Sequence, residues 1–418
     1  MTIHVVGAGL AGLAAAGTVA RAGRGRRVVL YEATAGAGGR CRSWHDRRLD
    51  AEIDNGTHVV LGANAAVRAH LDALGSSGEV AWLTAGPSLH PAGGGPPWRA
   101  AGPAGVLAAH RAFGGPAAAE LATALSLALP FGAATIGARL GRRSRLAAEL
   151  WDPLARAVMN TPSASADAAA FARVLRRTIL RGPAAMRVGV ARRSLARGFV
   201  DPALAQLRAL GAERHHGARL RSIGWAGDRP VRLHFGDATI DLAGDDTLIL
   251  ALPPWDLEGL VPAACIPAWQ ASPIVNLHVR VASPAAADGE PVLTGFAGRT
   301  ADWALLRDGV ASITTSAADA LVDADPEMLA RRLWADVAPA LGLADQPFPA
   351  RWRMVKERRA TPRQTPGYAA RRLVAAPPPG GILLAGDWTV PALPCTIETA
   401  LTSGVNAAMR ALAAANGR

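Results

Sequence analysis

The chain has 418 residues, of which 50% are hydrophobic and 19% are charged. This length suits two domains, or one large domain with an insertion, and the composition excludes a wholly disordered protein. The formal net charge of +12 would suit an anionic membrane or nucleic acid, but aromatic residues make up only 5% and do not interleave with a basic run. We therefore expect no nucleic-acid partner.

The cysteines Cys41, Cys265 and Cys395 lie far apart and form no CxxC pair. This pattern predicts neither a metal site nor a disulfide framework, and it fits a reducing, cytoplasmic compartment. The apolar stretch from Val5 to Ala20 has no basic region before it, and it lies inside the motif described next. We therefore do not interpret it as a targeting signal.

The first elements in the chain are a strand, a glycine-rich turn, a helix and a second strand. Residues 2–6 form an apolar strand, Gly7-Ala8-Gly9-Leu10-Ala11-Gly12 follows, and a second strand ends at Glu32. In the glycine-rich turn, the first glycine permits a tight turn, the second lets the backbone approach a pyrophosphate, and the third allows close packing of helix and strand. The helix N-terminus faces the phosphate, and Glu32 can bind the ribose hydroxyls. These features together predict a dinucleotide-binding site.

A second glycine-rich turn, Gly36-Ala37-Gly38-Gly39-Arg40, follows closely, and Asp54-Asn55-Gly56-Thr57-His58 comes after it. Backbone N–H groups and a guanidinium would then lie beside the same pyrophosphate. This arrangement resembles the GG-doublet flavoproteins, which include flavin amine oxidases and phytoene desaturases. By that resemblance, Gly38, Gly39 and Arg40 bind the FAD pyrophosphate, and residues 55–58 pass near the flavin.

The middle of the chain adds strands to this region. We predict one strand over 215–223, a hairpin of 231–235 and 238–242, and a buried strand over 246–254 that prolines end. The adjacent His215 and His216 have no third ligand and indicate a solvated strand end. In the resembled family, the position of Leu220 packs on adenine, and the strand through Ala251 closes the FAD domain.

Near the C-terminus, residues 381–385 predict a buried strand that ends in the turn Gly386-Asp387, and a helix is predicted over 401–414. Asp387 can accept a hydrogen bond from a ribityl hydroxyl, and the helix N-terminus at Thr396-Ile397-Glu398 can face the polar edge of a flavin. Taken alone, this segment could equally be an ordinary turn with Asp387 as a helix cap. The resemblance thus implies FAD contacts from Gly7, Gly9, Leu10, Ala11, Gly12, Glu32, Ala33, Gly38, Gly39, Arg40, Asn55, Gly56, Thr57, His58, Leu220, Ala251, Gly386, Asp387, Thr396, Ile397 and Glu398.

The predicted fold class is α/β, with a GG-doublet Rossmann-type FAD-binding domain and an inserted α+β substrate domain. The FAD-binding domain is assembled from residues 1–75, 196–260 and 373–418. A mainly helical substrate or membrane-facing region is predicted over 76–195, and the substrate domain over 261–372.

Two features disfavour an amine oxidase: Thr396 stands where those enzymes carry an aromatic residue, and the strand near His278 has no lysine. The segments 54–63, 150–162, 356–361, 385–389 and 394–398 resemble the squalene-associated FAD-dependent desaturases of bacterial hopanoid clusters, understood as hydroxysqualene dehydroxylases. The resemblance covers nearly the whole chain. It implies a reductive reaction, in which the substrate hydroxyl leaves as water and a hydride from reduced FAD gives squalene.

His58 is the candidate proton donor for that reaction, with a purely structural histidine as the alternative reading. Other classes stay open: an oxidative isoprenoid desaturase, an amine oxidase, or an isoprenoid carrier without enzymatic activity. The resemblance also implies an apolar isoprenoid substrate and contact with the enzyme that supplies hydroxysqualene.

Residues 116–138 contain Glu120 as their only charged residue and are rich in alanine, with Leu121, Leu125, Leu127 and Leu129 among them. One interpretation is that they form two core helices. The other is that they form a tunnel wall, or a face that lies on the inner side of the cytoplasmic membrane. Pro130 argues against a membrane-spanning helix. If this stretch faces a membrane, the arginines that flank it are Arg139, Arg142, Arg143 and Arg145.

Overall fold

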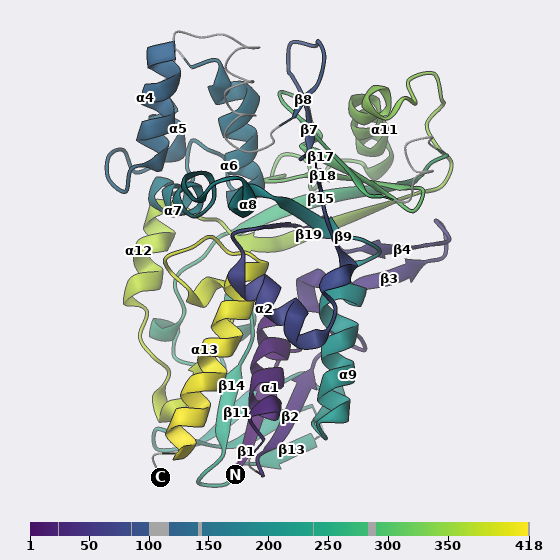
Figure 1. Cartoon of the computed structure of the whole chain (residues 1–418). Coiled ribbons are helices and arrows are strands. Elements are labelled where there is room, and N and C mark those ends of the chain that lie inside the picture. Colours follow the sequence, from purple (N-terminus) through teal and green to yellow (C-terminus); the bar gives the residue numbers. More distant parts are fainter. Residues whose placement is uncertain are drawn as a thin grey trace.

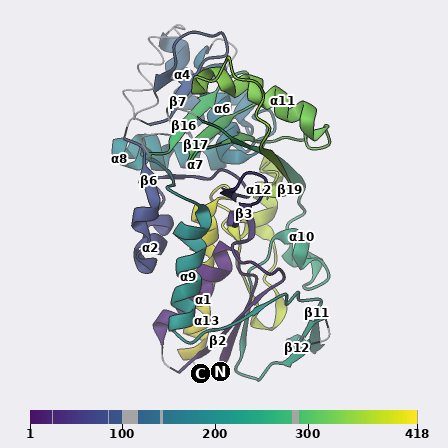
Figure 2. The same cartoon turned by 90° about the vertical axis from the view of Figure 1, so that its right-hand side faces the viewer.

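The computed structural model describes residues 1–23, 25–84, 86–99, 117–140, 144–236, 238–282 and 290–416. The molecule is elongated, with a parallel sheet and long helices in its lower half and a larger sheet with a group of helices in its upper half (Figure 1). The two chain ends lie beside each other at the bottom in both views (Figures 1 and 2).

The lower half is built on a five-stranded parallel sheet with the order β10-β2-β1-β14-β20. These strands are β1 (Thr2–Val6), β2 (Arg27–Glu32), β10 (Glu213–His216), β14 (Thr247–Leu250) and β20 (Leu383–Leu384). They come from the beginning, the middle and the end of the chain. Their carboxyl ends therefore meet at one edge of the sheet, which is where a parallel α/β sheet carries its ligand site.

Alternating side chains of the central strands face opposite sides of this sheet. Ile3 and Val5 of β1 lie in one core with the helices α1 (Leu10–Ala22), α9 (Asp201–Ala209) and α13 (Ile397–Asn416). Val6 and residues of β2 and β14 lie in a second core with the antiparallel sheet β11 (Ser222–Ala226), β12 (Arg229–Phe235) and β13 (Ala238–Asp241). Burial on both faces explains why these strands read as continuous apolar runs.

The first and last long helices, α1 and α13, pack almost backbone to backbone. A Cβ on Gly404 would stand 2.1 Å from the carbonyl oxygen of Ala11, and 3.0 Å from the Cβ of Ala14. The alanine-rich sequence of α1 permits this approach. It fixes the N-terminus of α13 near the loop that precedes α1.

The prediction of a single strand over 215–223 is wrong. β10 ends at His216, Gly217 adopts a φ of +73°, and β11 begins at Ser222 in a different sheet. The left-handed glycine turns the chain out of the parallel sheet, and Leu220 lies in the turn between the two sheets. The strand predicted over 381–385 is shorter than expected, since only Leu383 and Leu384 pair with β14.

The upper half contains a seven-stranded sheet with the order β19-β15-β18-β17-β16-β7-β8. Its strands are β7 (Ser88–His90), β8 (Trp98–Arg99), β15 (Ala271–Arg280), β16 (Val292–Phe296), β17 (Trp303–Arg307), β18 (Val310–Thr315) and β19 (Trp352–Pro362). The helix α11 (Pro326–Val337) packs on one face through Leu329 and Leu333. Most of this sheet comes from residues 261–372, but β7 and β8 come from the preceding region.

Helices from the region 76–195 cover the other side of the upper half (Figure 1). These are α4 (Ala117–Ala128), α5 (Ile136–Arg139), α6 (Asp152–Met159), α7 (Ala168–Thr178) and α8 (Pro183–Met186). Of these, α4, α5, α6 and α7 share a core that includes Trp151, Met159 and Phe171. Smaller elements connect the halves: α2 (Ala65–Leu74), α10 (Pro254–Leu257), α12 (Pro366–Val374), the pair β3 (Ser43–Asp46) and β4 (Ala51–Asp54), and the sheet β5 (Val59–Leu61), β9 (Val188–Ala191) and β6 (Val80–Trp82).

The apolar stretch over 116–138 is divided between core and surface. Leu127 and Ile136 are buried, whereas Leu121, Leu125 and Phe131 are exposed. Arg139 is buried and does not flank an exposed surface as predicted, while Arg142 and Arg143 lie outside the described residues. Within the described part of the chain, no helix is both long and apolar enough to cross a membrane.

Candidate functional site

The loop between β1 and α1 brings three glycines together at the carboxyl end of the parallel sheet. A Cβ on Gly7, whose φ is +103°, would stand 2.5 Å from the carbonyl oxygen of Ala251. A Cβ on Gly12 would stand 1.8 Å from the carbonyl oxygen of Gly7, but one on Gly9 would meet no atom within 4 Å. The fold therefore requires Gly7 and Gly12, whereas Gly9 borders open space at the N-terminus of α1, where a phosphate is favoured.

The second glycine turn lies directly on the first. Gly38 donates from its backbone N–H to the carbonyl oxygen of Ala8 at 2.8 Å, and a Cβ on Gly39 would stand 3.3 Å from Cα of Gly9. Gly38 and Gly39 have φ values of +102° and +55°. A side chain at either position would be strained, and at Gly39 it would also separate the two turns. Both glycine motifs of the sequence thus form one backbone cradle.

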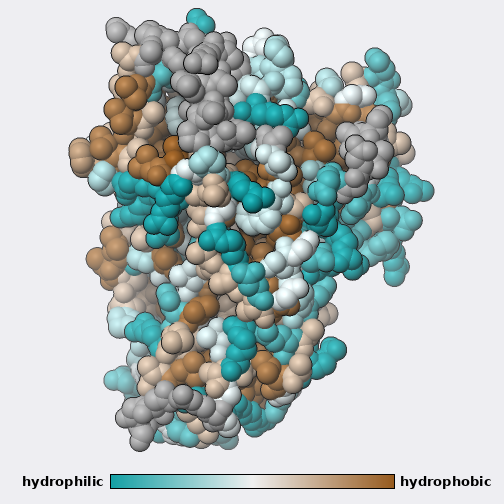
Figure 3. All heavy atoms as spheres, in the orientation of Figure 1, coloured by the Kyte–Doolittle hydropathy of each residue, from teal (hydrophilic) through white to brown (hydrophobic). Residues whose placement is uncertain are grey.

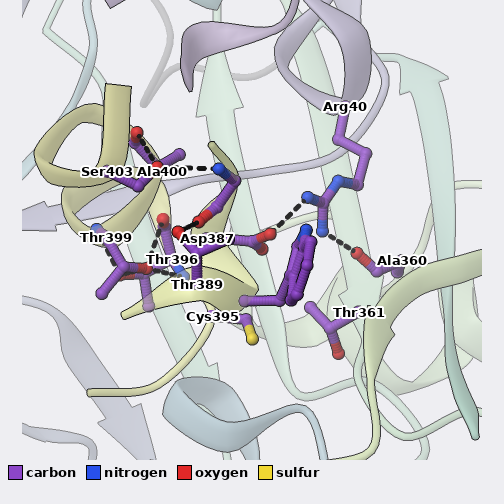
Figure 4. Close-up of polar contacts among 12 residues, drawn as sticks. Arg40, Ala360, Thr361, Asp387, Thr389, Cys395, Thr396, Thr399, Ala400 and Ser403 are labelled. Atoms are coloured by element: carbon purple, nitrogen blue, oxygen red, sulfur yellow. Dashed lines mark hydrogen bonds and ion pairs between the residues drawn. The ribbon is translucent and has the colours of Figure 1, made fainter. Parts of the chain in front are cut away.

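Arg40 joins this cradle to the C-terminal turn (Figure 4). Its guanidinium donates to a carboxylate oxygen of Asp387 at 2.8 Å and to the carbonyl oxygen of Ala360 at 2.7 Å. Burial alone would lower the pKa of Arg40, but the carboxylate of Asp387 outweighs it and raises the pKa overall. Asp387 is buried, so the pair is held in a setting where water screens it little.

The turn after β20 is fixed by a residue that the sequence analysis did not single out. The buried guanidinium of Arg372 donates to the carbonyl oxygens of Trp388 at 2.7 Å, Leu393 at 3.1 Å and Asp387 at 3.3 Å, and also to that of Val390. One arginine on α12 therefore shapes the loop that carries Asp387. An arginine in a short amphipathic helix carries no local signal of such a role.

The first turns of α13 lie beside Asp387, with Thr396 and Thr399 at the start of the helix (Figure 4). The hydroxyl of Thr399 accepts from the backbone N–H of Thr396 at 2.8 Å. The carboxylate oxygens of Glu398 accept from Ala66 and Val67 at the start of α2, at 3.1 and 3.0 Å. The side chain of Glu398 thus stabilises the junction of α13 with α2. A contact of residues 396–398 with a cofactor stays a prediction.

The loop over 55–58 lies between the cradle and the upper sheet. Asn276 on β15 donates to the carbonyl oxygen of Asn55 at 3.2 Å, and Asn55 donates to Glu357 on β19 at 3.2 Å. Among the described residues, Oδ1 of Asn55 and Oγ1 of Thr57 are buried without a hydrogen-bond partner. Buried polar atoms normally have partners, so these two favour a polar ligand beside the loop.

His58 is enclosed in the same region, with Nε2 at 4.0 Å from Sγ of Cys41. Burial lowers its pKa below the usual value, although the carboxylate of Asp54 acts in the opposite direction. Burial also raises the pKa of the Cys41 thiol to about 12. The imidazole is therefore neutral at pH 7, which favours a hydrogen-bonding role over one in which it carries the proton to be donated. The catalytic role of His58 stays a prediction.

The remaining predicted site residues are distributed along the carboxyl edge of the sheet. Glu32 accepts from the backbone N–H groups of Ala8 at 2.9 Å and Thr34 at 2.9 Å, and Ala33 follows it at the end of β2. Leu220 is buried beside the second core, and Ala251 lies under Gly7. The structure therefore places Glu32 at one end of the cradle, next to the first glycine loop.

Three segments that carried the narrower resemblance meet in space. Asn160, with a φ of +43°, donates to Oγ1 of Thr361 at 3.0 Å and accepts from the backbone N–H of Ala317 at 2.7 Å. Gln364 accepts from the backbone N–H of Cys395 at 2.8 Å. The segments 150–162, 356–361 and 394–398 thus form one connected framework behind the cradle.

The residues present fit a dinucleotide with a flavin. A cradle of two glycine turns opens at a helix N-terminus, an arginine lies beside it, and unpartnered buried polar atoms lie further along. Such a cradle suits a pyrophosphate because backbone N–H groups and a guanidinium supply positive charge without crowding it.

Comparison with known proteins identifies the class. The profile of the family described as flavin containing amine oxidoreductase matches residues 10–412. The chain belongs to this family, and it is a flavin-dependent oxidoreductase. The predicted fold class and the flavin cofactor are thereby confirmed.

The chain is also similar over its full length to proteins named hydroxysqualene dehydroxylase. It is 36% identical over 422 residues to that of Zymomonas mobilis, covering 98% of each chain, and 35% identical over 433 residues to that of Rhodopseudomonas palustris, covering 99% of each. The protein of that name from Sinorhizobium fredii is 35% identical over 421 residues, with 99% of each chain covered. The resemblance inferred from the sequence motifs is confirmed.

Solved structures share the fold at low sequence identity. Putrescine oxidase bound to putrescine has a TM-score of 0.74 at 17% identity, with 99% of each chain covered. A putative protoporphyrinogen oxidase from Exiguobacterium has a TM-score of 0.68 at 17% identity, with 98% of each chain covered. At these identities the likeness concerns the fold alone.

Proposed function

We propose that the chain removes the hydroxyl group of hydroxysqualene reductively and produces squalene, with FAD as its flavin. The observation that carries this proposal is the 36% identity to a hydroxysqualene dehydroxylase over 98% of both chains. In the balanced reaction the C–O bond breaks, the oxygen leaves as water with one added proton, and a hydride forms the new C–H bond.

FAD fits better than a mononucleotide because the site extends beyond the flavin end. Glu32 lies at the adenosine end of the Rossmann-type cradle, whereas Asp387 and the N-terminus of α13 lie at the other. A mononucleotide would leave Glu32 and the first glycine turn without a ligand. Bound and reduced, FAD supplies the hydride.

The residues of the chain bind and orient in this proposal. Gly9 leaves room for the pyrophosphate, Gly39 lets the second glycine turn lie against the first, and Arg40 places a positive charge beside the pyrophosphate. Asp387 accepts from a ribityl hydroxyl, and the N-terminus of α13 favours negative charge on the flavin. Asn55 and Thr57 offer buried acceptors on the side of the upper sheet, where the substrate must approach.

The substrate class follows from the same proposal. An apolar isoprenoid needs a water-excluding path between the cradle and the upper sheet, which also lowers the competition of water for a reacting cation. His58 is the predicted proton donor, and its neutral state at pH 7 means that it would have to take up a proton before each turnover. The proposal also includes a contact between this chain and an enzyme that supplies hydroxysqualene.

The test is anaerobic. The purified flavin-loaded protein is reduced with dithionite, hydroxysqualene is added in detergent, and squalene is measured by mass-resolved chromatography, with boiled protein and flavin-free protein as controls. We expect squalene in an amount matching the flavin that is reoxidised. A fully flavin-loaded protein that yields no squalene would refute the proposal and favour an oxidative isoprenoid desaturase.

A further inference from the structure

An exposed apolar surface lies on the upper helical edge of the molecule, away from the cofactor cradle. It is formed by Leu121 and Leu125 of α4, by Leu129 and Phe131 just after it, and by Leu180 after α7. Their exposed fractions are 61%, 54%, 40%, 69% and 68%. Figure 3 shows hydrophobic residues gathered along the edge where α4 and its following loop lie. We call these five residues the apolar edge.

The helix geometry places the three leucines of this edge on one surface. Leu121, Leu125 and Leu129 are spaced four residues apart and therefore lie on the same side of α4. The opposite side of α4 is tied down, because the carboxylate of Glu120 accepts from Ser144 at 2.6 Å and from the backbone N–H of Arg145 at 2.7 Å. The leucines thus face outward because the polar side of the helix is held inward.

The loop that presents Phe131 is held by a buried arginine. Arg139 donates to the carbonyl oxygens of Ala133 at 2.6 Å, Ser126 at 3.0 Å and Leu129 at 2.7 Å. Through these hydrogen bonds the guanidinium fixes the backbone at the end of α4 and in the turn after it. The hydrogen bonds of Arg139 therefore hold a loop that exposes Phe131. Exposing an aromatic side chain to water is unfavourable for a monomer.

Arginines without acidic neighbours in sequence lie beside the apolar edge. The segment 168–187 carries Arg173, Arg176, Arg177, Arg181 and Arg187 and contains neither Asp nor Glu. Arg176 donates to the carbonyl oxygen of Ala128 at 3.0 Å, which joins this basic segment to the end of α4. Arg177 and Arg181 are exposed on the same segment as Leu180. A basic rim next to protruding leucines and a phenylalanine complements an anionic bilayer surface.

We propose that the apolar edge inserts into one leaflet of a bilayer that contains anionic phospholipids, while the exposed Arg177 and Arg181 contact the lipid phosphates. Nucleic acid would pair with these arginines but leave the leucines and Phe131 in water. This inference goes beyond the proposed reaction and is tested by binding alone.

The experiment uses the full flavin-loaded chain. Sedimentation with vesicles of phosphatidylcholine containing about one third phosphatidylglycerol is measured at low and high salt, and compared with phosphatidylcholine alone. We expect binding to the anionic vesicles that weakens as salt screens the phosphates. Phe131→Ser should weaken it about tenfold, from the lost burial of one aromatic side chain. The double variant Arg177→Gln, Arg181→Gln should weaken it about 25-fold at low salt, at roughly fivefold for each arginine.

Matched controls come from α11 on the opposite edge of the upper half (Figure 1). Met328→Ser removes an exposed apolar side chain and Arg332→Gln an exposed arginine, and both should bind the vesicles like the parent. Because all the altered residues are exposed, circular dichroism should show the parent fold in each variant.

Three results would overturn the proposal. The first is no sedimentation with anionic vesicles at low salt. The second is binding that depends on the arginines but not on Phe131, which would indicate a purely electrostatic surface of the kind nucleic acid uses. The third is self-association of the parent that Phe131→Ser abolishes without any vesicle binding, which would assign the edge to a second copy of the chain.

Discussion

Replacing Gly9 by alanine should separate cofactor binding from folding. The backbone of Gly9 has φ −71° and ψ 176°, which alanine adopts without strain, and the added Cβ would meet no protein atom within 4 Å. The methyl group would instead occupy the space above the N-terminus of α1, where we place the pyrophosphate. The fold should therefore tolerate the change, whereas the cofactor should not.

The size of each effect follows from the geometry. Removing a glycine from a compatible position reduces the entropy of the unfolded chain, so the free energy of unfolding of the flavin-free protein should rise by about 0.4–1 kcal/mol. A methyl group that holds a phosphate away from the backbone N–H groups removes one charge-assisted hydrogen bond, worth about 1.5–3 kcal/mol. This corresponds to a loss of FAD affinity of roughly tenfold to hundredfold.

The assay pairs urea unfolding of the flavin-free protein with titration of FAD followed by flavin fluorescence. Gly17→Ala is the matched control, because Gly17 lies within α1 and its Cβ would meet only the ends of two flexible side chains, Arg21 at 3.2 Å and Gln206 at 3.6 Å. That variant should gain about 1 kcal/mol of stability from helix propensity and keep the parent affinity. If Gly9→Ala binds FAD as tightly as the parent, the open space above Gly9 is not the pyrophosphate site and the reasoning fails.

Three further predictions concern charges near the cradle and the upper sheet. Arg40→Met should lower the free energy of unfolding by about 3 kcal/mol in urea, because it leaves the buried carboxylate of Asp387 unpaired, and adding Asp387→Asn should restore part of that loss but not the flavin content. His278, whose burial lowers its pKa to about 4, protonates in the unfolded chain before it does in the folded one, so stability should fall by up to about 3 kcal/mol from pH 7 to pH 4. His278→Gln should flatten that slope in acid titrations followed by circular dichroism, and an unchanged slope would assign the acid sensitivity to other groups. His58→Gln should leave flavin content unchanged and reduce squalene formation if His58 donates the proton, and full activity with normal flavin would remove it from that role.

The local elements of the cofactor half could be read from the sequence because each obeys a short-range rule. A few consecutive residues are enough to recognise the turn from Gly7 to Gly12, the acid at Glu32 and the buried strand before Ala251. The break at Gly217 was missed because apolar alternation continues across a glycine whose left-handed conformation only the tertiary structure demands. The clamp made by Arg372 was missed for a related reason, since its acceptors are carbonyl oxygens up to 21 residues away.

The strand β19 links the two halves in a way that no single motif discloses. Its last residues face the cradle, where the carbonyl oxygen of Ala360 accepts from Arg40 and Thr361 accepts from Asn160. Its earlier residues, 352–357, pair with residues 274–279 of β15 in the upper sheet. Because a strand barely stretches, the same backbone that holds Arg40 also sets the distance of the upper sheet from the cradle. If FAD and the substrate bind as proposed, the alignment of the substrate carbon with the flavin would depend on the register of β19 against β15, and a change in that register would disturb catalysis without altering a residue of the cradle.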